Sequence, residues 1–343
     1  MKVGLLTGGG DCPGLNAVIR AAVTKGEKHY GDNFIGFLDG WLGAIENKAV
    51  ELSSARVRDI FDKGGTILGT SRTNPYKEQG GSQKVVSSLQ ARQLDALIAI
   101  GGDDTLGVAA KLAGEGVAVV GVPKTIDNDL SATEVTFGFH TAVQIATEAI
   151  DRLRTTSEAH QRVIICEVMG RHAGWIALYS GIAAGAVDVL VPEEPFDIDE
   201  VCELLKKRRS EGRLDAVVVV AEGAVPKAGS VSVTSGEVDQ FGHVRLGGVG
   251  NALAQEVEKR TGFETRATVL GHVQRGGTPT AYDRVLATRF GVAAIDALHE
   301  GAAGTMVALQ ADKIVRVPLS EAVSEPKLVP HDFYETVGRP LFG

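Results

Sequence analysis

The stretch DALIAIGGDDTLGVAAKLAGEGVAVVGVPKTIDND, residues 95–129, predicts the fold of this chain. It holds two apolar runs, 95–100 and 117–122, and the segment between them is amphipathic. Apolar runs of this length, bounded by glycine or charge, are typical of buried strands. Two such strands joined through a helical segment form a parallel pair with a crossover connection. The stretch therefore predicts a mainly parallel sheet flanked by helices.

The same alternation recurs along the rest of the chain. Further apolar runs lie at 3–6, 163–168, 215–221 and 268–270. A helix-like segment, 141–157, begins a second strand–helix series, so we place a domain boundary near Gly138. The chain is then an α/β protein of two domains, and it crosses back to the first domain later. Residues 223–248 depart from this pattern and predict an exposed hairpin or excursion.

Composition excludes several classes of function. With 343 residues, 44% of them hydrophobic, the chain is long enough to bury a large core. Its net charge of -8 argues against non-specific binding to nucleic acid or anionic membranes. No apolar stretch reaches the ~20 residues of a membrane helix, so we expect a soluble protein. Cys12, Cys166 and Cys202 are too scattered for a disulfide framework, which favours a cytoplasmic location.

Polar loops follow the predicted strands, where ligands bind in sheets of this kind. GGDDT, 101–105, offers backbone N–H groups for phosphate and a carboxylate, Asp103, for magnesium. Its alternative is an Asp N-cap. PKTIDND, 123–129, offers a cation and acids that suit deprotonating an alcohol, and its alternative is an Asx-rich turn. The glycine loop at 8–14 precedes a predicted helix and suits an anion, or is a tight turn.

Basic residues also stand beside turns and strand ends. Each alone is more simply a surface ion pair, but together, in a chain of negative net charge, they predict a convergent anion pocket. They are Arg72, Arg162, Arg171, Arg266, His272 and Arg275. The eight histidines show no zinc-binding spacing, so we predict no zinc site.

Six motifs together resemble the phosphofructokinases of the bacterial type. They are GGGDCPGLNAVIR (8–20), GGTILGTSR (64–72), PKTIDND (123–129), EAIDRLR (148–154), VMGRHAGW (168–175) and TRATVLGHVQRGG (265–277). The resemblance implies a phosphoryl-donor and magnesium domain of residues 1–138 plus about 275–325. It also implies a sugar-phosphate domain of residues 139–274 plus the C-terminal tail. The sites would be closed between subunits of a homo-oligomer, a dimer or a tetramer.

The resemblance also implies a role for each site residue. Asp127 would be the base acting on the C1 hydroxyl of fructose 6-phosphate, with Thr125 and Asp129 beside it, and Asp103 would hold Mg²⁺. Arg72 and Arg171 would neutralise charge as the phosphoryl group moves. The donor would lie against Gly10, Gly102, Asp104, Thr105 and Lys124. The sugar phosphate would lie against Met169, Gly170, Glu222, His272 and Arg275, with Arg162 and Arg266 from the neighbouring subunit.

Two positions distinguish the phosphoryl donor within that family. ATP-using members usually carry glycine in place of Asp104, and commonly in place of Lys124. The pair here resembles the pyrophosphate-dependent members, which reversibly form fructose 1,6-bisphosphate and phosphate in glycolysis and gluconeogenesis. A carboxylate ~4 Å from the α-phosphate of ATP is repelled by about 4 kcal/mol at an effective dielectric constant of ~20. Some ATP-using relatives also have the lysine, so Asp104 carries most of the distinction.

Three alternatives stand beside this interpretation. An ATP-dependent 6-phosphofructokinase would use the same scaffold. An NAD or lipid kinase would use the GGDDT loop but would leave His272 and Arg275 unexplained. A non-catalytic sugar-phosphate sensor would not need both Asp103 and Asp127. At the family's effector site Arg20 and Arg154 are kept, whereas Thr24, Ser54 and 212–214 depart from the pattern, so the resemblance implies a non-allosteric enzyme.

Overall fold

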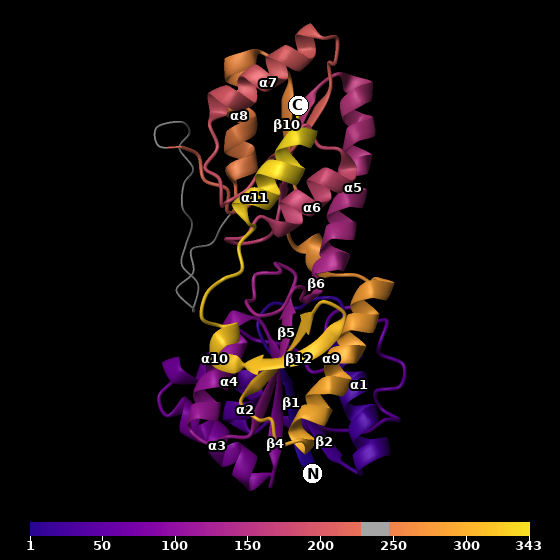
Figure 1. The fold of residues 1–343 in the computed structure, drawn as a ribbon, viewed down its shortest axis with the longest axis vertical. Coiled ribbons are helices and arrows are strands. Elements are labelled where there is room, and N and C mark those ends of the chain that lie inside the picture. The colour runs from indigo at the N-terminus through magenta and orange to yellow at the C-terminus, as the bar shows by residue number, and fades with distance from the viewer. Residues whose placement is uncertain (228–246) are drawn as a thin grey trace. The chain divides into compact units, whose positions relative to one another are not determined.

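The computed structural model describes residues 1–227 and 247–343 (Figure 1). They form two compact units, one of Met1–Thr141 with Arg275–Pro326 and the other of Ala142–Gln274 with Lys327–Gly343. The sequence-based division placed its boundaries at 138/139 and 274/275. Most of the predicted excursion at 223–248 lies outside the described residues.

The first unit is built on a sheet whose strands follow the order β12-β11-β5-β4-β1-β2-β3. Its central strands, β1 (Lys2–Thr7), β2 (Asn33–Phe37), β4 (Ala96–Gly101) and β5 (Val119–Thr125), run parallel. β11 (Thr305–Gln310) is parallel to β5, and the short β6 (Phe137–Gly138) also pairs with β5. At the two edges, β3 (Ala49–Leu52) and β12 (Lys313–Pro318) are antiparallel.

Helices pack around this sheet. They are α1 (Leu15–Lys25), α2 (Trp41–Glu46), α3 (Gly81–Ala91), α4 (Asp103–Gly114), α9 (Ala281–His299) and α10 (Leu319–Ala322). Every residue of β4 and β5 is buried, which explains their near-continuous apolar sequence. Leu6, Leu97, Ala99, Leu106 and Met306 are part of the core between the sheet and its helices.

The second unit holds a smaller, wholly parallel sheet in the order β10-β7-β9-β8. The strands are β7 (Val163–Val168), β8 (Asp188–Leu190), β9 (Ala216–Ala221) and β10 (Thr265–Val269). The helices are α5 (Phe139–His160), α6 (Trp175–Ala184), α7 (Ile198–Ser210), α8 (Val249–Thr261) and the one-turn α11 (His331–Phe333). The inner strands β7 and β9 are fully buried, whereas the edge strand β10 is partly exposed.

The six predicted apolar runs are confirmed as β1, β4, β5, β7, β9 and β10. The predicted helices after residue 14 and over 141–157 are confirmed as α1 and α5. The prediction did not identify β2, β3, β6, β8, β11 and β12. Of these, β3, β8 and β12 are edge strands that are short or half exposed and lack a long apolar run. β2 and β11 are largely buried inner strands that the prediction missed. In the part of the chain that the structure describes, no helix has the length and apolar character needed to span a membrane.

Candidate active site

Adjacent strand ends bring the predicted site loops of the first unit together. β1, β4 and β5 are neighbours in the sheet, and the register pairs Thr7 with Ile100 and Gly101 with Pro123. The glycine loop, the GGDDT loop and the PKTIDND loop therefore begin at one edge of the sheet, at the carboxyl ends of its strands.

The GGDDT loop forms the first turn of α4. Gly102 is its N-cap, and both Asp103 and Asp104 stand in the first turn. The alternative of an Asp N-cap is therefore wrong. Thr105 is buried against the strand end, and a Cβ on Gly101 would lie 2.3 Å from the Cβ of Thr105. The glycines let the start of α4 approach the sheet, and both carboxylates stand beside the N–H groups that a phosphate can use.

The glycine loop is held by the segment that carries Arg72. The hydroxyl of Thr70 donates to the carbonyl of Gly9 at 2.5 Å, and the amide of Gly9 donates to the carbonyl of Ser71 at 3.1 Å. Arg72 follows directly, so these bonds bring it next to the loop that contains Gly10.

Two cations approach the same glycine loop from elsewhere in the chain. Lys124 is 3% exposed, and its Nζ donates to the carbonyl of Gly10 at 2.5 Å. Arg275 donates from Nη1 to the carbonyl of Asp11 at 3.4 Å. A Cβ on Gly10 would lie 2.5 Å from the same Nη1, so this position has room for glycine alone unless Arg275 moves. Arg275, predicted to bind the sugar phosphate, thus contacts the loop predicted to bind the donor.

The pKa of Lys124 depends on its burial and on the charged side chains around it. Burial lowers the pKa of its ammonium, and the charge of Arg275 lowers it further, while Asp127 and Asp103 raise it. An anionic ligand at this place would offset the lost hydration and favour the charged form. The arrangement therefore suits a compact, highly charged anion.

Asp127 is a buried carboxylate with an open acceptor. It is 3% exposed, its amide donates to Thr125 Oγ1 at 3.0 Å, and Thr125 Oγ1 lies 3.4 Å from Asp127 Oδ2. Its Oδ1 is buried and has no hydrogen-bond partner among the described residues. Asn128, by contrast, accepts from the amide of Thr136 at 3.0 Å, which fixes the turn. The turn alternative therefore accounts for Asn128 but leaves Asp127 available for chemistry; Asp129 follows in the same turn.

In the second unit, the predicted sugar-phosphate residues follow β7, β9 and β10. Arg171 has a φ of 52°, and its amide donates to Glu222 Oε1 at 3.0 Å. Gly170 has a φ of 144°, and a Cβ there would lie 2.4 Å from the carbonyl oxygen of Ala173. Only glycine fits this turn, which presents Arg171 next to the loop that carries Glu222.

A buried glutamine that sequence reasoning did not select joins two of these loops. Gln274 is 0% exposed, its Oε1 accepts from the amide of Met169 at 3.3 Å, and its Nε2 donates to the carbonyl of Gly271 at 3.1 Å. It therefore positions the turn that carries His272, which is exposed. The sequence feature that could have identified Gln274 is its place in a loop rich in glycine and cationic residues.

Arg162 and Arg266 lie at the opposite end of the same strands. Arg162 directly precedes β7, whereas Met169 directly follows it. Both arginines pair with Glu264, Arg162 at 3.1 Å and Arg266 at 2.9 Å. A strand of this length spans roughly 20 Å, so the structure does not bring these arginines to Met169 of their own chain.

The family model described as Phosphofructokinase matches residues 2–298 of this chain. The chain belongs to the phosphofructokinase family. It is 61% identical over 98% of both chains to a pyrophosphate--fructose 6-phosphate 1-phosphotransferase of Amycolatopsis methanolica. It is 55% identical, again over 98% of both chains, to an ATP-dependent 6-phosphofructokinase of Mycobacterium tuberculosis. Phosphofructokinases named for different donors are therefore similar to this chain at comparable identity.

Solved phosphofructokinase structures share the fold. The pyrophosphate-dependent phosphofructokinase of Marinobacter aquaeolei superimposes with a TM-score of 0.83 at 23% identity, covering 100% of this chain and 92% of that one. The six motifs that carried the resemblance lie within the matched residues.

Replacing Gln274 with methionine should raise the KM for the sugar phosphate about tenfold or more. Methionine fills the space but makes neither bond, and a buried amide left without its acceptor costs about 1–3 kcal/mol. The measurement is steady-state kinetics against each substrate, with the exposed neighbour Val273→Ala as the control. An equal change in the KM of both substrates would show that Gln274 has a purely structural role.

Proposed function

We propose that this protein transfers a phosphoryl group reversibly from pyrophosphate to the C1 hydroxyl of D-fructose 6-phosphate, giving D-fructose 1,6-bisphosphate and phosphate. Relatives bearing that name at 59–61% identity support the reaction. Because ATP-dependent relatives follow at 54–55%, identity alone does not select the donor. The proposal of pyrophosphate as donor rests on Asp104, which lies in the first turn of α4, the helix that starts beside the end of β5 where the buried Lys124 lies.

Asp127 acts as the general base. Its open Oδ1 takes the proton of the C1 hydroxyl while the hydroxyl oxygen attacks the terminal phosphorus of pyrophosphate. The bridging P–O bond breaks and phosphate leaves. Thr125 and Asp129 orient Asp127, while Arg72 and Arg171 neutralise the charge that develops on the transferred group.

The donor lies against Gly10, Gly102, Thr105 and Lys124. Lys124 already bonds the carbonyl of Gly10, so it holds the glycine loop and adds a positive charge beneath it. Asp104 carries a negative charge where the α-phosphate of ATP would pass. Pyrophosphate is shorter than ATP and ends before that position, so Asp104 excludes the nucleotide without hindering the smaller donor.

The chain's own residues fit a magnesium ion that enters with the donor. The described residues contain no cluster of three or more histidine, cysteine or acidic side chains able to hold a metal alone. Mg²⁺ commonly uses one or two carboxylates together with substrate phosphate oxygens and water. Asp103 supplies such a carboxylate at the start of α4. When bound, the ion neutralises charge on the phosphates.

The active form is a homo-oligomer, a dimer or a tetramer, in which Arg162 and Arg266 bind the 6-phosphate in a neighbouring subunit's site. Their position at the far end of β7 and β10 from Met169 supports this arrangement. Met169, Gly170, Arg171, Glu222, His272 and Arg275 bind the sugar phosphate from the site's own chain.

Mixing two inactive variants, Asp127→Asn and Arg162→Ala, should restore activity. A hybrid then contains sites with Asp127 from one chain and Arg162 from the next, so about a quarter of the sites are intact. The measurement is turnover after co-refolding. The matched control mixes Asp127→Asn with Arg171→Ala, which act in one site and should stay inactive. Activity in the control mixture, or no activity in the first mixture, would show that Arg162 does not complete the active site of a neighbouring subunit.

The enzyme is non-allosteric and cytoplasmic in this proposal. Arg20 donates to the carbonyl of Arg58 at 3.1 Å, and Arg154 donates to the carbonyl of Ala184 at 2.7 Å. Each bond uses only one N–H group of its arginine, so the non-allosteric assignment rests on Thr24, Ser54 and residues 212–214, which depart from the effector-site pattern. The free, buried cysteines Cys12, Cys166 and Cys202 suit a reducing compartment. Reversible interconversion of fructose 6-phosphate and fructose 1,6-bisphosphate would serve glycolysis in one direction and gluconeogenesis in the other.

The deciding assay measures fructose 1,6-bisphosphate formation with Mg²⁺ and either pyrophosphate or ATP at matched concentrations. Turnover with pyrophosphate alone is the expected result. Turnover with ATP alone would identify an ATP-dependent 6-phosphofructokinase and overturn the role of Asp104. A protein that binds fructose 6-phosphate without turnover on either donor would be a sugar-phosphate sensor.

A further inference from the structure

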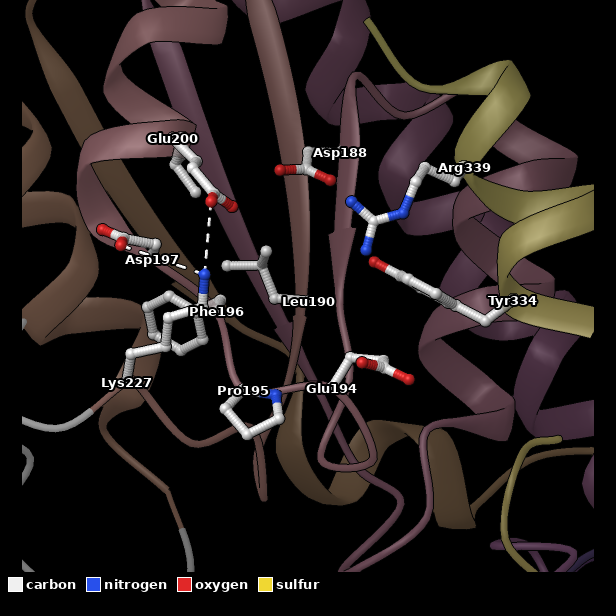
Figure 2. Close-up of a pocket in the computed structure, with 11 residues that line it drawn as sticks. Asp188, Leu190, Glu194, Pro195, Phe196, Asp197, Glu200, Lys227, Tyr334 and Arg339 are labelled. Atoms are coloured by element: carbon white, nitrogen blue, oxygen red, sulfur yellow. Dashed lines mark hydrogen bonds and ion pairs between the residues drawn. The ribbon is translucent and has the colours of Figure 1, made fainter. Parts of the chain in front are cut away.

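A cavity of about 160 Å³ lies in the second unit beside the edge strand β8 (Figure 2). Its walls come from β8, the loop before α7, the first turn of α7, Lys227, and the C-terminal segment after Pro330. None of the residues that line it belongs to the candidate active site. The cavity is therefore a separate feature that phosphoryl transfer leaves unexplained.

Two opposite charges, those of Asp188 and Arg339, face this cavity and form no ion pair with each other, although Arg339 pairs with Glu335. Figure 2 shows the Asp188 carboxylate and the Arg339 guanidinium pointing toward the same space. Asp188 Oδ1 accepts from the amide of Val189 at 2.9 Å, and Arg339 Nε donates to Glu335 Oε1 at 2.7 Å. Across the described ranges 1–227 and 247–343, no residue bonds Asp188 Oδ2 or the Nη nitrogens of Arg339. Asp188 Oδ2 can therefore still accept a hydrogen bond, and the Nη nitrogens of Arg339 can still donate.

The other charges around the cavity already have partners. Lys227 Nζ lies 3.2 Å from Glu200 and 3.9 Å from Asp197, and Glu194 bonds the ring of His331. Burial raises the pKa of Asp188 to about 6, a shift that Glu200 increases and that Val189 and Arg339 oppose. The unmatched carboxylate is therefore the group that gains most from a bound cation.

We propose that this cavity binds a small zwitterion with an ammonium and a carboxylate a few bonds apart, which is the chemistry of a free α-amino acid. Its ammonium would bond Asp188 Oδ2, and its carboxylate would bond the Nη nitrogens of Arg339. A ligand with a single charge would match only one of the two groups and leave the other as it is. A molecule that carries both charges satisfies both at once.

The size and lining of the cavity restrict the ligand further. At ~30 Å³ per water molecule, the space holds about five waters, which suits a ligand the size of a small amino acid. Leu190, Phe196 and Val201 give part of the wall an apolar surface that a short aliphatic side chain can contact. The chemistry therefore favours small or short aliphatic amino acids over bulky ones.

Binding should also stabilise the C-terminal segment. Tyr334 donates to the carbonyl of Val189 at 2.8 Å, and the amide of Gly343 donates to the carbonyl of Val187 at 2.9 Å. The segment thus covers the outer edge of β8. A ligand between Asp188 and Arg339 would add a bridge between these two elements and raise the midpoint of thermal unfolding.

The test is calorimetric titration of the full chain with glycine, L-alanine and L-valine, and with acetate and methylammonium as single-charge probes. At least one amino acid should bind and raise Tm, and neither single-charge probe should. Asp188→Asn and Arg339→Gln should each weaken binding by about tenfold or more, the loss of one charge-assisted hydrogen bond. The matched control, Arg213→Gln, alters an exposed arginine of the same unit and should leave binding unchanged.

Several results would overturn the proposal. They are absence of heat and of a Tm shift with every amino acid at millimolar concentration, equal binding of acetate or methylammonium, or unchanged binding in both variants. Arg339 has a side chain that is 56% exposed, so Arg339→Gln should fold and carries the test even if Asp188→Asn does not. Phosphoryl transfer at saturating substrate should stay unchanged in Arg339→Gln, which separates this test from that of the proposed function.

Discussion

Replacing Asp127 with asparagine should lower kcat by about 10²–10⁴-fold, the usual contribution of a positioned general base. Asparagine keeps the shape, and its side-chain oxygen can still accept from the hydroxyl of Thr125 as Asp127 Oδ2 does, but it cannot take the proton of the C1 hydroxyl. Because fructose 6-phosphate is held by other groups, its KM should change little. Steady-state kinetics with pyrophosphate, together with sugar-phosphate binding by calorimetry, measures both effects.

Asp283→Asn is the matched control for this variant. Asp283 is another fully buried carboxylate of the same unit whose Oδ1 lacks a partner among the described residues. Its Oδ2 accepts from the amide of Thr141 at 2.7 Å, a bond that asparagine can keep. If both variants lost kcat to the same extent, the effect would come from neutralising a buried charge, and Asp127 would not be the base.

Replacing Asp104 with glycine should raise kcat/KM for ATP by about a thousandfold, the equivalent of the ~4 kcal/mol repulsion between a carboxylate and the α-phosphate. Asp104→Asn separates charge from size, since it removes the charge and keeps the bulk. If the electrostatic argument holds, asparagine should give most of the gain. Initial rates with ATP and with pyrophosphate, measured on both variants, give the comparison.

A double variant, Asp104→Gly with Lys124→Gly, tests both positions together. Lys124 is buried and bonds Gly10, so glycine at 124 removes a charge, leaves a cavity and releases the glycine loop. Pyrophosphate activity should fall in the double variant for all three reasons. Unchanged ATP activity in Asp104→Gly, with unchanged pyrophosphate activity in the double variant, would show that neither residue selects the donor.

Local sequence was enough to predict the strands that carry the site loops and the order of those loops, but not the inner strands β2 and β11. The runs that became β4, β5, β7 and β9 are apolar at nearly every position because both faces of an inner parallel strand are buried. Edge strands lack this signature, since one side meets solvent or a single helix. β3 and β12 were therefore visible only in the sheet itself.

The sequence by itself determined the family, the α/β class and the identity of the reactive groups, because motif composition records which chemistry each loop can support. Tertiary structure alone decided which groups meet. Lys124 reaches Gly10, Arg275 reaches Asp11, and Gln274 joins Met169 to Gly271 across long separations in the chain. Such contacts depend on sheet register and helix packing, which no local pattern of residues encodes. The open oxygen of Asp127 likewise becomes apparent only when every neighbouring donor has been placed.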